Sequence, residues 1–136
     1  MNSPVLLDTC AVIWLMNGEP MNGESREAIR RAQSAGVYVS PITAWEIGIL
    51  VAKGRLQLTL SPETWFDELL RLPGMRLAEL SPKILLDSSG LPGLPPRDPA
   101  DRIIAATARL FGYSIVTRDS GMAEYGEAGH LRVIGC

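Results

Sequence analysis

The chain has 136 residues, of which 46% are hydrophobic and 21% charged, and this balance predicts one globular domain over residues 1–136. The formal net charge of −2 argues against a protein that holds nucleic acid through bulk positive charge. Cys10 and Cys136 have neither metal-binding spacing nor the number needed for a disulfide framework, and no uncharged stretch is long enough to span a membrane. We therefore expect a cytoplasmic protein without a zinc site or a membrane anchor.

The first half of the chain alternates between strand and helix patterns. The apolar run 5–7 predicts a buried strand, and 10–16 has room for a helix of about two turns. Residues 24–35 predict an exposed helix, 37–39 a second strand, and 41–52 a helix that begins with a serine cap and a proline. This order favours a parallel sheet whose strands are joined by helices.

The second half continues the alternation. In chain order we expect a link at 56–60, a helix at 61–71, a strand at 75–80, a helix beginning at 81–82, a stiff loop at 90–96, a helix beginning at 98–99, a strand at 114–117, a short turn at 122–125 and a strand at 131–134. In the helix after 98–99, one row of residues (101, 104, 105, 108 and 111) forms an apolar, core-facing stripe with an acid at its end. We also expect Trp45 to pack in the core.

Acidic residues stand at points where the pattern is otherwise apolar. Asp8 and Asp119 follow apolar strands, Glu46 is the sole charge of its predicted helix, and Asp101 ends the apolar stripe just after Asp98. Because the carboxyl ends of parallel strands meet at one edge of a sheet, these carboxylates can converge there. Structural alternatives stay open: Asp8 and Asp98 are also good helix caps, and a buried ion pair would also explain Glu46.

Several carboxylates in one pocket repel one another, and a hard divalent cation resolves the repulsion. We therefore predict that Asp8, Glu46, Asp101 and Asp119 bind Mg²⁺ or Mn²⁺, which activates water for phosphoryl chemistry. The lone histidine, His130, lies far along the chain and is expected at the surface, so metal-bound hydroxide would serve as the base.

Hydroxyl and basic side chains near the acids complete the predicted site. Thr9 and Thr117 each lie beside a strand-end carboxylate and would orient it or simply cap a helix. The candidates for contacts with substrate phosphates are Lys53, Arg55, Arg102 and Arg118.

Four segments in this order resemble the motifs of PIN-domain ribonucleases of the VapC toxin type. They are Leu6-Leu7-Asp8-Thr9, Ile42-Thr43-Ala44-Trp45-Glu46-Ile47, Arg97-Asp98-Pro99-Ala100-Asp101-Arg102 with Ile104 to Ala108, and Val116-Thr117-Arg118-Asp119. The resemblance implies a three-layer α/β/α sandwich and a Mg²⁺- or Mn²⁺-dependent endoribonuclease of a toxin-antitoxin system. It also implies a homodimer that a VapB-type antitoxin holds inactive.

The same resemblance assigns residue roles. The catalytic and metal-binding acids would be Asp8, Glu46, Asp101 and Asp119. Asp98 would be an auxiliary acid or the helix cap, and Thr117 matches the small hydroxyl residue before the last acid.

Other protein classes also gather acids at strand ends. A receiver domain would need paired acids after its first strand and a lysine near the last strand, and an aspartyl phosphatase would need Asp where Cys10 stands. An RNA-processing or flap-type PIN nuclease usually carries extra segments. A non-catalytic PIN fold that serves as a binding subunit is the remaining alternative.

Overall fold

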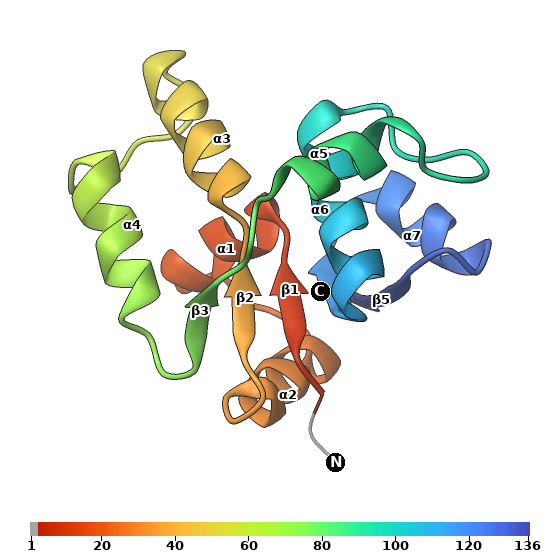
Figure 1. Cartoon of the computed structure of the whole chain (residues 1–136). Coiled ribbons are helices and arrows are strands. Elements are labelled where there is room, and N and C mark those ends of the chain that lie inside the picture. The colour runs from red at the N-terminus through yellow and green to blue at the C-terminus, as the bar shows by residue number, and fades with distance from the viewer. Residues whose placement is uncertain (1–2) are drawn as a thin grey trace.

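The structure, a computed structural model, describes residues 3–136 and contains a parallel sheet surrounded by helices (Figure 1). The strands β1 (Val5–Leu7), β2 (Val37–Val39), β3 (Met75–Leu77), β4 (Ser114–Thr117) and β5 (Arg132–Gly135) form one sheet in the order β3-β2-β1-β4-β5, with every neighbouring pair parallel. The helices are α1 (Thr9–Met16), α2 (Gly23–Ala32), α3 (Pro41–Ala52), α4 (Pro62–Leu70), α5 (Pro82–Ser89), α6 (Pro99–Phe111) and α7 (Ser120–Glu127).

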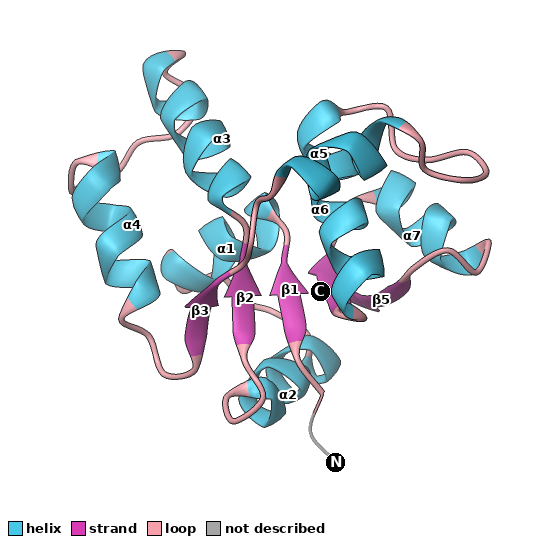
Figure 2. Ribbon diagram, in the orientation of Figure 1, coloured by secondary structure: helices cyan, strands magenta, loops and turns pink. Residues whose placement is uncertain are grey.

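Two buried clusters lie on opposite faces of the sheet. Successive residues of β1 point to opposite faces, so Val5 and Leu7 belong to one cluster and Leu6 to the other. The first cluster includes residues of α1, α2, α3 and α4, whereas the second includes residues of α6 and α7. Figure 2 shows the strands at the centre with helices around them. The predicted α/β/α architecture is therefore confirmed.

The predicted helix starts are confirmed by their caps. Ser40, Ser61 and Ser81 each accept a hydrogen bond from a backbone N–H of the first turn, and a proline follows each of them. Asp98 plays the same part for α6, again with a proline in the first helical position. At the other end of α6, Gly112 closes the helix with a φ of +74°.

The predicted turn at 122–125 is wrong, because α7 is an eight-residue helix. Its cap is Asp119, and Met122 and Tyr125 on its inner face are buried. The Tyr125 hydroxyl also donates to the carbonyl oxygen of Pro92, 2.6 Å away. Capping and burial outweigh the poor helix propensity of its glycines, which is the signal that favoured a turn.

Two aromatic residues expected in the core lie at the surface. The side chain of Trp45 is 58% exposed and that of Phe111 is 41% exposed. Helix α3 is apolar on almost every side, so its sequence does not show which residues face inward. Phe111 is the last residue of α6 and stacks on Tyr113, with ring centroids 5.5 Å apart, instead of entering the core. Ile104 on the same stripe is fully buried, as predicted.

Some element boundaries differ from the predicted ranges. The strand expected over 75–80 ends at Leu77, the last strand begins one residue late, and the helix expected over 24–35 spans Gly23–Ala32. Within residues 3–136, no helix is long and apolar enough to cross a membrane.

Candidate active site

Asp8 lies at the point where β1 ends and α1 begins, and both oxygens of its carboxylate accept hydrogen bonds. Oδ1 accepts the backbone N–H of Ala11 at 2.8 Å, and Oδ2 accepts the hydroxyl of Thr117. Only 3% of Asp8 is exposed, and burial raises the pKa of its carboxyl. The hydrogen bonds from Thr117 and Ala11 lower this pKa, while the nearby charge of Asp119 raises it. Asp8 is thus both a helix cap and a buried acid.

Asp119 reaches the same edge of the sheet from β4. The parallel pairing of β1 with β4 sets Leu7 opposite Val116, so that the residues after each strand lie side by side. Thr117 connects the two acids, since it donates to Asp8 and its oxygen accepts the backbone N–H of Asp119 at 2.9 Å. The Asp119 carboxylate in turn caps α7. The sequence predicted that Thr117 would orient the acid beside it, Asp119, but its hydroxyl donates to the carboxylate of Asp8 instead.

Glu46 approaches the acids from α3 and is held by Thr9, whose hydroxyl also contacts that of Thr43. The hydroxyl of Thr9 donates to the Glu46 carboxylate, and the hydroxyl oxygens of Thr9 and Thr43 are 3.0 Å apart. The sequence predicted that Thr9 would orient Asp8, the acid beside it, and Thr43, which is fully buried, was not predicted to belong to the site. The available signal was its position one turn before Glu46 on an apolar helix.

The protein environment favours the protonated form of Glu46. Burial raises the pKa of Glu46, the hydrogen bond from Thr9 lowers it, and the charges of Asp98 and Asp8 raise it. The charges of two other acids therefore act on the carboxylate of Glu46. Within residues 3–136, Glu46 forms no ion pair with a basic side chain.

Asp101 contributes an acid from the first turn of α6. Its backbone N–H donates to the carboxylate of Asp98, which is exposed and caps the helix. Burial raises the pKa of Asp101 to about 7, and the charges of Asp98, Asp119, Glu46 and Asp8 contribute to the rise. A carboxyl with this pKa is partly protonated at neutral pH.

The thiol of Cys10 is affected by the same four acids. Burial, together with the charges of Asp8, Asp101, Glu46 and Asp119, raises its pKa to about 11. All four predicted acids therefore act electrostatically on one position in the first turn of α1, which the sequence had shown only as part of an apolar run.

The basic residues predicted to contact substrate phosphates form no ion pairs with the acids within residues 3–136. Arg102 donates from Nε to the carbonyl oxygen of Pro96 at 2.8 Å. Arg118 donates to the carbonyl oxygen of Cys136, and its guanidinium carbon lies 3.0 Å from the ring centroid of Trp14. Lys53 and Arg55 are exposed at and just beyond the C-terminal cap of α3.

The acids fit a hard divalent cation in their chemistry. All donors are carboxylate oxygens; burial and, after it, the charges of the neighbouring acids raise the pKa of Asp101, and a cation would relieve the repulsion between these charges. Within residues 3–136, no three His, Cys, Asp or Glu side chains already stand in a metal-binding arrangement. The carboxylates would therefore have to move closer together to share an ion.

Comparison with known proteins places this chain in a family. Residues 5–128 match the family model of the PIN domain. The chain is 32% identical over 117 residues to Ribonuclease VapC22 of Mycobacterium tuberculosis, across 85% of this chain and 86% of that relative. Its fold is similar to a chain of VapBC2 from Rickettsia felis bound to promoter DNA, with a TM-score of 0.70, 16% identity, and coverage of 97% of this chain and 98% of that chain. It is likewise similar to a chain of DNA-bound VapBC from Salmonella typhimurium, with a TM-score of 0.66, 20% identity, and coverage of 99% and 98%. This chain therefore belongs to the PIN-domain family and is a relative of the VapC ribonucleases.

Proposed function

We propose that this protein is an endoribonuclease toxin of a VapBC-type toxin-antitoxin system and that residues 1–136 form its single nuclease domain. The observation that carries the proposal is the convergence of four carboxylates from four separate elements at the carboxyl edge of the sheet. A curated relative with the name ribonuclease, matched over most of both chains, supports the choice of RNA as substrate.

In this proposal Asp8, Glu46, Asp101 and Asp119 hold Mg²⁺ or Mn²⁺. When bound, such an ion lowers the pKa of a coordinated water and stabilises the charge on the leaving oxygen of a phosphodiester. The neighbouring hydroxyls orient the carboxylates: Thr117 fixes Asp8 through Oδ2, and Thr9 directs Glu46 toward the α1 side of the site. Asp98 fixes the first turn of α6 and adds negative charge beside Asp101.

The partners belong to the same proposal. The solved structures of similar fold are toxin-antitoxin complexes such as VapBC, which supports a VapB-type antitoxin as the inhibitor of this chain. We further propose that the protein acts as a homodimer in the cytosol, where its RNA substrate is found.

A cleavage assay on the purified, antitoxin-free protein tests the proposal. Total bacterial RNA is incubated with wild type, Asp8→Asn, Asp101→Asn and the control Asp67→Asn, which alters an exposed acid of α4, with Mg²⁺, Mn²⁺ or EDTA. We expect discrete cuts for wild type and Asp67→Asn in either metal, mapped by sequencing the new ends. We expect no cuts in EDTA or for the two site variants. If all four proteins gave the same background of RNA ends, with no cuts that depend on the metal, the nuclease proposal would be wrong and the domain would be a binding subunit instead.

A further inference from the structure

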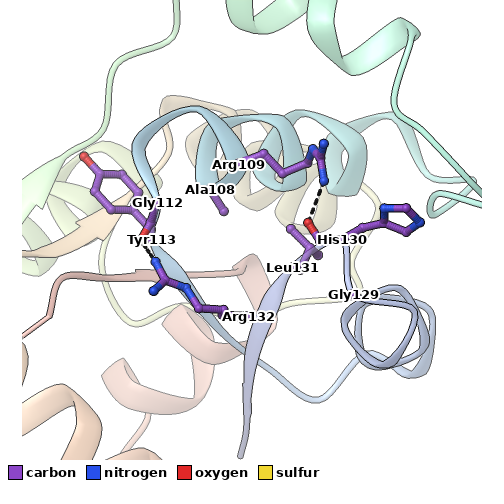
Figure 3. A pocket seen from close by; sticks show the side chains of 8 residues that line it. All are labelled: Ala108, Arg109, Gly112, Tyr113, Gly129, His130, Leu131 and Arg132. Atoms are coloured by element: carbon purple, nitrogen blue, oxygen red, sulfur yellow. Dashed lines mark hydrogen bonds between the residues drawn. The ribbon is translucent and has the colours of Figure 1, made fainter.

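A cavity lies at the opposite edge of the sheet from the acids, between the end of α6 and the start of β5 (Figure 3). It has a volume of about 290 Å³. The residues that line it include Arg109, His130 and Arg132 and no acid. Positive charge thus gathers at one concave place on a protein whose net charge is −2.

The two guanidinium groups are fixed at the cavity by backbone oxygens. Arg109 donates from Nη1 to the carbonyl oxygen of His130 at 2.7 Å, and Arg132 donates from Nη2 to the carbonyl oxygen of Gly112 (Figure 3). A guanidinium has five N–H donors, so one such bond sets its position and leaves donors for a ligand. These bonds reduce the side-chain entropy that a ligand would otherwise cost.

No carboxylate within residues 3–136 forms an ion pair with either guanidinium. Elsewhere on the surface, Arg30, Arg31 and Arg71 are paired with glutamates. The positive charge at the cavity is therefore not neutralised by the protein and is available to an anion.

A neighbouring cavity suggests what the anion is attached to. It has a volume of about 360 Å³, shares Arg109 with the basic cavity, and is lined in part by Leu86, Leu91 and Leu110 and by the carboxylate of Asp87. Leu86 is 74% exposed. A basic cavity beside one lined by leucines and a single carboxylate matches a nucleotide, in which a phosphate is joined to a sugar with hydroxyl donors and to a flat, weakly polar base.

We propose that the basic cavity binds the phosphate group of a nucleotide, with the base against the leucines of the neighbouring cavity and the sugar hydroxyls near Asp87. The planar fork of arginine matches phosphate oxygens in geometry and charge. The nucleotide is either free or part of RNA, and the second source rests on the proposed nuclease function. Eight residues of α6 separate Asp101 from Arg109, about 12 Å along the helix axis, or about four stacked nucleotides.

Calorimetric titration in EDTA tests the site without involving cleavage. The probes are adenosine 5′-monophosphate and, as the matched ligand without phosphate, adenosine. We expect wild type to bind only the monophosphate, Arg132→Gln to bind it about tenfold or more weakly, and Arg132→Lys to lose less. The control Arg71→Gln removes a surface charge on the far side of the sheet and should bind like wild type. Thermal unfolding of each variant verifies folding, since Arg132→Gln also frees the Gly112 carbonyl.

Absence of monophosphate binding to wild type, or equal weakening by Arg71→Gln, would overturn the site even if the protein cleaves RNA. Cleavage kinetics then identify the source of the phosphate. A raised KM with unchanged kcat in Arg132→Gln supports an RNA phosphate, whereas an unchanged KM together with monophosphate binding supports a free nucleotide. Binding by a protein that cleaves no RNA would uphold the site and refute the nuclease proposal.

Discussion

Replacing Asp101 by Asn should stabilise the metal-free protein at neutral pH. Burial and the surrounding acids raise the pKa of Asp101 from its ordinary value of 3.8 to about 7. The folded state therefore binds this proton more tightly than the unfolded state does. Consequently the carboxyl contributes stability at low pH and loses that contribution as the pH rises from about 4 to about 7. Asparagine has no charge to lose over this range.

The size of the effect follows from the same pKa. Each tenfold change in a proton equilibrium is worth about 1.4 kcal/mol, so ionisation of Asp101 costs at most about 4 kcal/mol at pH 8. Because the carboxyl is only partly buried, water reduces this cost, and we expect about 2–3 kcal/mol. For a chain of 136 residues this corresponds to roughly 7–10 °C in Tm.

Urea unfolding in EDTA between pH 4 and pH 9 provides the measurement. The free energies of unfolding of wild type and Asp101→Asn should agree near pH 4, separate up to about pH 7 and then stay parallel. The exposed Asp67→Asn variant serves as the control and should follow wild type throughout. A wild type that is as stable as Asp101→Asn at pH 8 would refute the idea that the acids are held together against their repulsion.

Three further outcomes are expected. Millimolar Mg²⁺ should raise the Tm of wild type but hardly that of Asp101→Asn, and EDTA should reverse the gain; equal gains would place the ion elsewhere. Thr117→Val should cost about 1–3 kcal/mol and slow cleavage, because two polar partners lose the buried hydroxyl, whereas Thr117→Ser should keep both properties. In chemical unfolding, Ile104→Ala in the core should cost about 2–5 kcal/mol and Leu94→Ala, 93% exposed, less than about 0.5 kcal/mol; similar losses would contradict the assigned core.

The placement of the strand-end acids was predictable because it depends on topology. Asp8 and Asp119 each follow an apolar run, and parallel strands bring such residues to one edge whatever the details of packing. In the structure the charge of Asp119 acts on Asp8, and the charges of Asp8, Glu46, Asp101 and Asp119 all act on Cys10. Their chemical roles are proposals that the cleavage assay addresses.

Contacts between helices were not predictable in the same way. Thr9 and Glu46 are 37 residues apart, and their hydrogen bond depends on how α1 and α3 cross. The sequence shows that Thr9 lies next to Asp8, which led to the expectation that it serves that acid. Likewise, Trp45 lies on a helix that is apolar nearly all round, so hydrophobic periodicity carries no information about its direction.

The hydrogen bonds of the basic residues were also not predictable from the sequence. In the folded protein, Arg102 donates to the carbonyl oxygen of Pro96 and Arg118 to that of Cys136, and these bonds fix where each guanidinium lies. Every residue has a carbonyl group, so no sequence pattern indicates which carbonyl oxygens accept a hydrogen bond from an arginine.

The hydrogen bond between Thr117 and Asp8 joins residues 109 positions apart. During synthesis, Asp8 is made early, while its partner strand β4 and the acid Asp119 appear only after α6 has been translated. Until then β1 lacks one of its two neighbours in the sheet, and the carboxylates cannot gather. For most of the elongation time, a ribosome making this chain therefore carries Asp8 without the other acids gathered around it.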